Sequence, residues 1–256
     1  MAAEGRPGSL TWRLGTVAEV VPETPRATSI VLELPGWPGH RAGQHVDVRL
    51  AADGYQVQRS YSIASAPEDG YVVLTVERVA DGVVSPYLVS ELAAGDQLEL
   101  RGPIGDFRWD DSAREPVLLV AGGWGIAAFR AMLRHLQAVR GDVPVRLLYS
   151  ARSLQDVIYL QELLRFAAFD EVDIRFALTR TWPESWHGHS GRIDSRLLSD
   201  VAWPAEDRAR VFICGPSPFM AAVGGMLTAM GQRADRIWTV RLSVFDSRIN
   251  QIDAFA

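Results

Sequence analysis

The chain contains no lysine, so all 26 of its basic residues are arginine. This absence excludes two classes of enzyme, since a P-loop needs a lysine on the nucleotide phosphates and a Schiff-base enzyme needs a lysine amine. Among the 256 residues there is one cysteine, Cys214. A single thiol can neither form a disulfide within the chain nor hold an iron–sulfur cluster. If electrons leave this protein for an iron–sulfur centre, that centre belongs to a partner.

Long apolar runs are also missing, and no stretch approaches the roughly 20 residues that a transmembrane helix needs. Residues 1–6 lack the basic and then apolar pattern of a signal peptide, so a cytoplasmic location is expected. The net charge of −5 argues against general nucleic-acid binding. The pair His187 and His189 has no acidic or thiol neighbour at metal-ligand spacing, so this segment is interpreted as a loop and no metal is expected.

The first half of the chain predicts short strands separated by turn residues. Residues 45–50 alternate polar and apolar side chains, as a half-buried strand does. The expected strands are 12–21, 28–34, 45–50, 58–63, 71–79 and 97–101, with one helix at 84–92. Six strands and one helix predict a small antiparallel β-barrel.

From the polar segment 110–116 onward, strands and helices alternate. The expected strands are 117–120, 145–149, 172–178, 211–213 and 237–240, and the expected helices are 125–140, 154–166, 196–201 and 218–230. Such alternation predicts a mostly parallel, doubly wound sheet, whose ligands bind beyond the carboxyl ends of the strands. The chain is therefore expected to have two domains: a six-stranded antiparallel β-barrel over 8–111 and an α/β doubly wound parallel sheet over 112–256.

Four motifs follow one another along this framework. Arg59-Ser60-Tyr61-Ser62 lies in the β-rich half, and Gly102-Pro103-Ile104-Gly105 closes that half. Gly122-Gly123-Trp124-Gly125 stands between an apolar strand and a helix, and Cys214-Gly215-Pro216 follows a buried strand. Glycines without Cβ atoms at the start of a helix allow a pyrophosphate to approach the backbone amides. An ordinary strand-to-helix turn, with glycine for geometry alone, is the alternative.

In this order the motifs resemble the flavin- and pyridine-nucleotide-binding halves of the ferredoxin–NADP reductase family, over residues 12–239. The resemblance implies an oxidoreductase that passes hydride from NADPH to bound FAD and then single electrons to a separate acceptor. That acceptor is expected to be ferredoxin, another iron–sulfur or haem protein, or an oxygenase component. NADH in place of NADPH remains open, and a monomer without membrane insertion is expected.

The resemblance also implies roles for residues of the flavin half. Arg59 contacts the flavin pyrophosphate, Tyr61 packs on the isoalloxazine ring and Ser62 bonds near flavin N5. Residues 75–79 resemble the second flavin-contacting strand, and residues 82–88 resemble the helix start that caps the FAD pyrophosphate. A plain helix cap is the alternative role of the serine in that segment. The flavin-binding residues implied are Arg59, Ser60, Tyr61, Ser62, Val76, Arg78, Gly82, Val84 and Ser85.

In the nucleotide half, the resemblance places Cys214 beside the nicotinamide, so Ser62 and Cys214 are the catalytic candidates. A buried cysteine acting as a small apolar residue is the alternative. Arg152, Arg180 and Arg192 match arginines around the 2′-phosphate in bacterial NADPH-dependent members, with solvated surface arginines as the alternative. The nucleotide-binding residues implied are Gly122, Gly123, Gly125, Ser150, Arg152, Thr179, Arg180, Arg192, Cys214, Gly215 and Pro216.

Three departures from the family pattern concern the nicotinamide side. Trp124 stands where a small residue is usual, Ala128 stands where proline is usual, and Val240-Arg241-Leu242 replaces the usual Glu-x-aromatic segment. An indole in the glycine turn would crowd the nicotinamide or stack on it. These departures motivate the alternative function, a non-enzymatic or impaired flavin-binding electron-transfer subunit that NAD(P)H does not reduce. A diaphorase that reduces free flavin, quinones or dyes is a third alternative.

Overall fold

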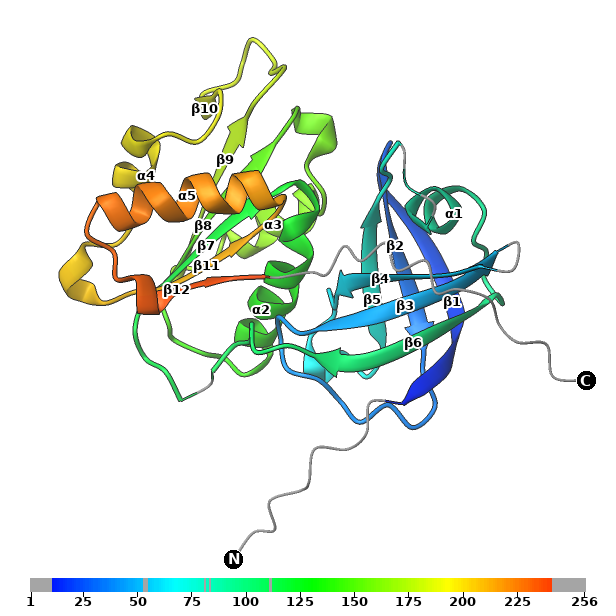
Figure 1. The fold of residues 1–256 in the computed structure, drawn as a ribbon. Coiled ribbons are helices and arrows are strands. Elements are labelled where there is room, and N and C mark those ends of the chain that lie inside the picture. The colour runs from blue at the N-terminus through cyan, green and yellow to red at the C-terminus, as the bar shows by residue number, and fades with distance from the viewer. Residues whose placement is uncertain (1–10, 53–54, 81, 83, 111, 241–256) are drawn as a thin grey trace, which may run out of the picture.

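The computed structural model of the chain describes residues 11–52, 55–80, 82, 84–110 and 112–240. Its first sheet is antiparallel throughout, in the order β4-β3-β6-β1-β2-β5, and it curls into a barrel (Figure 1). The strands are β1 (Trp12–Thr24), β2 (Ala27–Glu33), β3 (His45–Ala52), β4 (Tyr55–Ser62), β5 (Val72–Glu77) and β6 (Gln97–Ile104). A bridge between Ile63, just after β4, and Leu74 brings the two edge strands together. The short helix α1 (Val84–Ser90) follows β5.

Alternation of side chains along these strands builds the barrel core. Ile30 and Leu32 in β2 and Leu98 and Leu100 in β6 are buried in one cluster. Glu99, between the last two, points outward instead, as the two-residue period of a strand requires. The predicted antiparallel barrel is thus confirmed.

The second sheet is parallel, in the order β10-β9-β8-β7-β11-β12. The strands are β7 (Val117–Gly122), β8 (Val145–Ala151), β9 (Val172–Leu178), β10 (His189–Ser190), β11 (Arg210–Cys214) and β12 (Ile237–Thr239). The helices are α2 (Ile126–Ala138), α3 (Leu160–Phe166), α4 (Ser195–Val201) and α5 (Ser217–Ala229). Within the described part of the chain, every helix is too short or too polar to cross a membrane.

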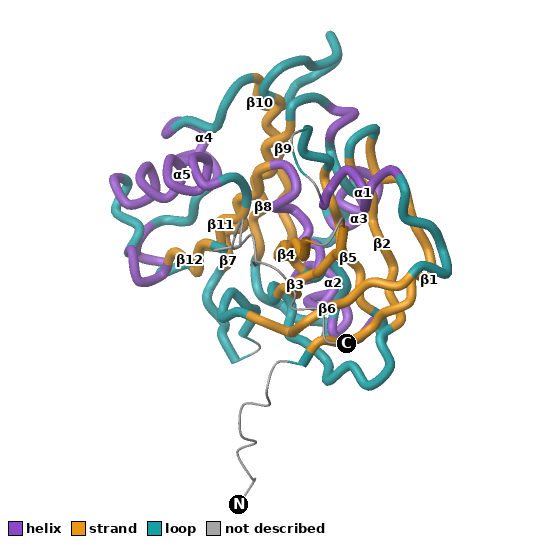
Figure 2. Tube along the Cα trace, turned by 45° about the vertical axis from the view of Figure 1, so that its right-hand side comes forward, coloured by secondary structure: helices purple, strands orange, loops and turns teal. Residues whose placement is uncertain are grey.

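Both faces of the parallel sheet are covered by helices, as the doubly wound prediction requires. Leu119 and Ala121 of β7 pack in the cluster that contains α2 and α3, whereas Leu118 and Val120 pack in the cluster that contains α4 and α5. Figure 2 shows α4 and α5 on the side of the sheet away from the barrel. The central strand is therefore apolar on both faces, which is typical of parallel sheets.

The prediction of a helix over residues 154–166 is wrong for residues 154–159. The 3-10 turn Leu154–Asp156 is followed by Tyr159 in the left-handed region, with φ of 63°, and α3 begins at the next residue. This break turns Tyr159 toward the barrel, where its hydroxyl forms hydrogen bonds with Thr75 and with Ser29. A contact between domains therefore overrides local helix propensity, and a bulky residue outside its preferred backbone region is a strained one.

Strand β10 lies in a segment that the sequence analysis interpreted as a loop. Its two residues pair in parallel with the end of β9, with His189 opposite Ala177 and Ser190 opposite Leu178. A strand of two residues is too short to produce a periodic pattern in the sequence, which is why it was missed. It extends the nucleotide-domain sheet at the edge formed by β9.

Arginines of α2 join the two domains. Arg134 donates two hydrogen bonds to the carboxylate of Asp69 in the barrel, at 2.9 and 2.7 Å, and a third to Glu162 at 2.8 Å. Arg130 binds Glu162 at 2.6 Å and the carbonyl of Ala64 at 3.1 Å. Bidentate arginine–carboxylate pairs are directional as well as strong. These contacts fix how the end of the parallel sheet faces the barrel.

Candidate functional site

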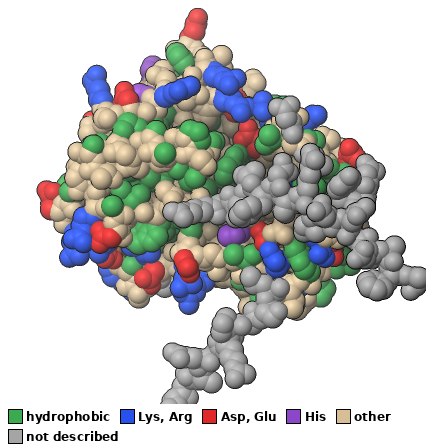
Figure 3. Space-filling model, viewed as in Figure 1, with side chains coloured by type: hydrophobic (Ala, Val, Ile, Leu, Met, Phe, Trp, Pro, Cys, Tyr) green, Lys and Arg blue, Asp and Glu red, His purple; other side chains and the backbone are tan. Residues whose placement is uncertain are grey.

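The carboxyl ends of the parallel strands form one edge of a cavity. Gly122 at the end of β7 pairs with Ser150 in β8, and Ala121 pairs with Cys214 in β11. Across a cavity of about 320 Å³, this edge faces the end of β5. The candidate residues that line the cavity are Arg78, Gly122, Gly123, Ser150, Arg152, Thr179 and Pro216. In Figure 3, arginine side chains gather at the top of the molecule, where Figure 1 places the ends of β8 and β9.

The two glycine-containing motifs of the nucleotide domain form a single structure. A Cβ added at Gly125 would stand 2.1 Å from the carbonyl oxygen of Cys214 and 2.8 Å from the amide nitrogen of Gly215. Gly123 has φ of 53°, a conformation that favours glycine. The turn after β7 therefore lies directly against the end of β11. This close approach requires glycine at position 125. The packing alone therefore accounts for this glycine, whether or not an anion binds at the turn.

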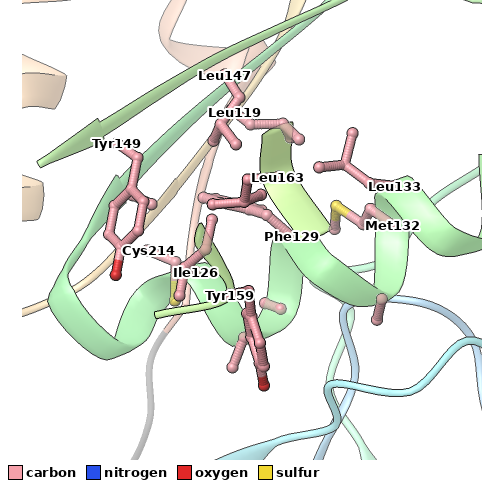
Figure 4. Packing of buried hydrophobic residues seen from close by; sticks show 14 of the residues in the cluster. Leu119, Ile126, Phe129, Met132, Leu133, Leu147, Tyr149, Tyr159, Leu163 and Cys214 are labelled. Carbon is pink, nitrogen blue, oxygen red and sulfur yellow. The ribbon is translucent and has the colours of Figure 1, made fainter. Parts of the chain in front are cut away.

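Cys214 is completely buried beneath this turn. Its side chain belongs to the core cluster, and Figure 4 shows its sulfur beside Ile126 and Tyr149. Burial raises the pKa of the Cys214 thiol to about 12. Because the reactive form of cysteine is the thiolate, a neutral buried thiol is unreactive. The side chain thus packs as a small apolar group, and its role toward the nicotinamide stays a prediction.

We expect a thiol reagent such as 5,5′-dithiobis(2-nitrobenzoate) to leave Cys214 unmodified in the folded protein between pH 6 and pH 9. The thiol is buried and has a raised pKa, so it stays protonated across this range. One equivalent should react after unfolding in guanidinium chloride. The chain has one cysteine, so the native protein and the unfolded protein are each other's control. Fast labelling of the native protein would contradict the burial of this side chain.

On the barrel side, β4 presents Tyr61 and Ser62 in different ways. The Ser62 side chain is buried, and its Oγ has no hydrogen-bond partner among the described residues. An unpaired buried hydroxyl costs about 1–3 kcal/mol, so this position fits a ligand atom that would bond to it. Burial raises the pKa of Tyr61, whose ring packs against the barrel core. Arg59 donates from Nη1 to the carbonyl of Gln58 at 2.8 Å.

Ser60 has a different environment from Ser62, although the two share a face of β4. Its Oγ donates to Oδ1 of the buried Asp47 at 2.6 Å. The same carboxylate accepts a hydrogen bond from Arg101 at 2.7 Å. The hydroxyl of Ser60 is therefore hydrogen-bonded within the barrel, and Ser60 does not line the cavity.

The segment before α1 is held by Ser85, whose Oγ accepts a hydrogen bond from the backbone N–H of Val79 at 3.0 Å. A Cβ added at Gly82 would lie 3.0 Å from that oxygen. Val76 and Val84 are buried in the barrel core, so their side chains are not available to a ligand. Ser85 therefore holds the chain that leads into α1, and its role toward a pyrophosphate stays a prediction.

The three candidate arginines stand at the ends of neighbouring strands. Arg152 lines the cavity, and its carbonyl accepts a hydrogen bond from the backbone N–H of Arg180 at 2.9 Å. Arg192 follows Gly191, whose N–H donates to Leu178 at the end of β9. The side chains of Arg180 and Arg192 are exposed, and neither is among the residues that line the cavity.

Apart from Trp124, seven residues that line this cavity are not among the predicted site residues: Arg26, Glu77, Val79, Ala80, Ala151, Asp156 and Phe219. Arg26 and Glu77 come from the barrel, and Phe219 comes from α5. Glu77 could have been found from alternation, because Val76 beside it points into the barrel core and the next residue must point out. Phe219 carried no such signal: its ring lies 2.9 Å from the position of a Cβ at Gly122.

Of the departures from the family pattern, Trp124 lines the cavity and packs partly against the core cluster. Ala128 is fully buried within α2. Val240 is buried, and its N–H donates to the carbonyl of Ile213 at 3.4 Å, while Arg241 and Leu242 lie outside the described residues. Within the described ranges, His, Cys, Asp and Glu side chains form no group of three that could hold a metal ion.

Comparison with known proteins matches both halves. The family model described as Oxidoreductase FAD-binding domain matches residues 28–109. The family model described as Oxidoreductase NAD-binding domain matches residues 119–224. The chain is 35% identical over 199 residues to the glycine betaine monooxygenase reductase subunit of Pseudomonas aeruginosa, an alignment that covers 77% of this chain and 54% of that protein. It thus spans about half the length of this relative.

Two further similarities come from Escherichia coli and Vibrio cholerae. NADH oxidoreductase HCR of Escherichia coli is 33% identical over 223 residues, or 86% of this chain and 65% of that protein. The FAD/NAD-binding domain of nitric oxide dioxygenase from Vibrio cholerae superposes with a TM-score of 0.80 at 26% identity, covering 89% of this chain and 97% of that one. The two-domain fold is therefore that of flavin- and nicotinamide-binding oxidoreductases.

Proposed function

Because the chain belongs to the ferredoxin–NADP reductase family of FAD- and NAD-binding oxidoreductases, we propose that it is an NAD(P)H-dependent flavoprotein reductase. It takes hydride from NADPH or NADH and delivers single electrons to a separate acceptor protein. FAD, when bound, supplies the conversion of a two-electron donor into one-electron steps. We further propose 8–111 as the flavin-binding part, 112–256 as the nucleotide-binding part, and the cytoplasm as the location.

One observation carries this proposal: the glycine turn at Gly122 and Gly123 and the end of barrel strand β5 line the same cavity. Each domain therefore contributes a wall to one space. A cavity at the carboxyl ends of parallel strands is where ligands of doubly wound sheets bind. A nucleotide on one wall and a flavin on the other would then meet in the same space, and no separate carrier would be needed between them.

Residues of the barrel strand β4 and residues of the nucleotide wall of the cavity have distinct tasks in this proposal. Arg59 binds the flavin pyrophosphate, and Tyr61 packs on the flavin ring. The Ser62 hydroxyl, which has no hydrogen-bond partner among the described residues, donates a hydrogen bond near flavin N5. The backbone amides at Gly122 and Gly123 and the Arg152 guanidinium bind nucleotide phosphates, and the half-buried Trp124 helps to exclude water from the cavity.

We propose NADPH as the preferred donor. Arg152, Arg180 and Arg192, at the ends of β8, β9 and β10, are the residues that would bind its 2′-phosphate. Each charge-assisted contact is worth about 1.5–3 kcal/mol, so two of them would give a preference of about a hundredfold or more. The Escherichia coli relative is named an NADH oxidoreductase, so both nucleotides belong in the test.

The proposed acceptor is an oxygenase component or a ferredoxin. The name of the Pseudomonas aeruginosa relative, a monooxygenase reductase subunit, supports the first of these. With its one cysteine buried in the core, this chain has no thiolate set for a cluster of its own. An iron–sulfur centre that receives the electrons therefore lies outside these 256 residues.

The experiment that tests the function is an anaerobic absorbance titration of the FAD-loaded protein with NADPH and, in parallel, with NADH. We expect the flavin band to bleach near one equivalent of NADPH, because the two walls of the cavity hold donor and flavin together. A stable flavin spectrum with both nucleotides would support the alternative of an impaired flavin-binding subunit, for which Trp124 in the cavity is the specific observation. Failure to bind FAD would contradict the roles given to Arg59, Tyr61 and Ser62.

A further inference from the structure

Glu77, at the end of barrel strand β5, lies close to Arg152 of the nucleotide domain across the cavity. Its Oε1 lies 3.5 Å from Nη2 of Arg152 and 3.8 Å from Nε of Arg26. Its Oε2 lies 3.1 Å from the position that a Cβ on Gly123 would take. The Glu77 side chain is 17% exposed, so this carboxylate lies within the space between the domains.

The guanidinium of Arg152 does not use all of its hydrogen-bond donors in this arrangement. Its Nη1 is buried and has no hydrogen-bond partner among the described residues. Its contact with Glu77, at 3.5 Å, is long for a hydrogen bond and acts mainly through charge. A phosphate accepts two parallel hydrogen bonds from a guanidinium and would satisfy Arg152 better than this single carboxylate oxygen does.

Resting on the proposed function, we infer that Glu77 is a selectivity residue of the nucleotide site, because its carboxylate competes with the 2′-phosphate of NADP(H) for Arg152. NADP(H) must draw Arg152 away from Glu77, whereas NAD(H), which has no 2′-phosphate, leaves the ion pair intact. Glu77 therefore reduces the preference for NADP(H) that the arginines at the strand ends create.

Other charges around the cavity allow a matched control. Asp156 also lines the cavity, and its carboxylate accepts a hydrogen bond from Ser153 Oγ at 2.6 Å. Among the ion pairs of the described residues, Arg152 is joined to Glu77 and not to Asp156. Asp156→Asn thus removes one negative charge from the same cavity without touching the pair.

The test compares the binding of NADP⁺, NAD⁺ and 2′,5′-ADP to the FAD-loaded protein and to its variants by isothermal titration calorimetry. In Glu77→Gln we expect about fivefold tighter binding of NADP⁺ and 2′,5′-ADP, the order of a partly exposed ion pair, and NAD⁺ within about twofold of wild type. Glu77→Asp keeps the charge but shortens the side chain away from Arg152, so NADP⁺ binding should tighten there also. Asp156→Asn should stay within about twofold for all three ligands.

The outcomes separate this inference from the proposed function. An equal gain for NAD⁺ and NADP⁺, or the same gain in Asp156→Asn, would show a general charge effect and overturn the selectivity role of Glu77. Unchanged NADP⁺ binding in Glu77→Gln would overturn it as well, while nucleotide binding by the wild type would leave the proposed function standing. If wild type and variants alike bound neither nucleotide, the proposed function itself would fail, and the inference with it.

Discussion

Gly125→Ala is expected to destabilise the protein by about 2–4 kcal/mol and to weaken NADP⁺ binding more than tenfold. The added Cβ would stand 2.1 Å from the carbonyl oxygen of Cys214, a backbone atom at the end of β11 that has no rotamer by which to move away. Relief of this contact requires the turn after β7 to separate from β11, and overpacking of this kind is costly. The phosphate-binding amides belong to the same turn, so binding and stability should fall together. Urea denaturation and a calorimetric NADP⁺ titration measure the two effects.

Gly225→Ala is the matched control for that substitution. Gly225 lies inside α5, and no atom stands within 4 Å of a Cβ added there. Alanine in a helix interior is favoured over glycine by about 0.5–1 kcal/mol, so this variant should be as stable as wild type or more stable. Nucleotide binding should not change. If Gly125→Ala behaved like Gly225→Ala, the turn would be free to move, and the close packing of the two motifs would not matter for the site.

Much of this architecture follows from local pattern. The alternation in β3 and the turn-separated short strands predict the barrel, and the strand–helix order after residue 116 predicts the parallel sheet. The meeting of Gly125 with Cys214 follows one step later, because neighbouring parallel strands end at the same edge. Periodicity and topology are enough for these features, since neither depends on how the two domains are docked.

Features that depend on the docking could not be predicted in this way. The segment 154–166 contains neither glycine nor proline, so local rules give an unbroken helix. Hydrogen bonds from Tyr159 to Ser29 and Thr75 across the interface break that helix. The contact of Glu77 with Arg152 likewise joins the two domains, from the end of β5 to the residue after β8. No single-sequence pattern encodes such a pairing.

Ser60 and Ser62 show the same limit within one strand. They are two residues apart in β4, so alternation gives them the same face and the sequence offers no reason to separate them. The difference comes from β3, where Asp47 accepts the hydroxyl of Ser60 at 2.6 Å. Ser62 is opposite His45 in the register, and its Oγ has no partner among the described residues. One hydroxyl is therefore part of the barrel wall, and the other is available to a ligand.

Ser62→Ala should slow reduction of the flavin by NADPH about 10²–10³-fold at saturating nucleotide, the range found when one preorganised donor at a reacting centre is removed. The same change should leave the flavin-free protein as stable as wild type or more stable, because it removes a buried hydroxyl without a partner among the described residues. Anaerobic stopped-flow absorbance measures the rate, and thermal unfolding measures the stability. Loss of rate without loss of stability is the pattern of a residue kept for function.

Ser60→Ala should show the opposite pattern, and this contrast makes the prediction specific. Its hydroxyl bonds to Asp47, so its removal should cost about 1 kcal/mol of stability and change the reduction rate by less than about twofold. Equal rates in Ser62→Ala and wild type would show that the Ser62 hydroxyl makes no contact in the reacting complex. The hydroxyl without a partner among the described residues would then be a local cost of the fold. Hydride transfer would depend on Tyr61, which packs on the flavin ring in this proposal, and on the Gly122–Gly123 turn, which binds nucleotide phosphates.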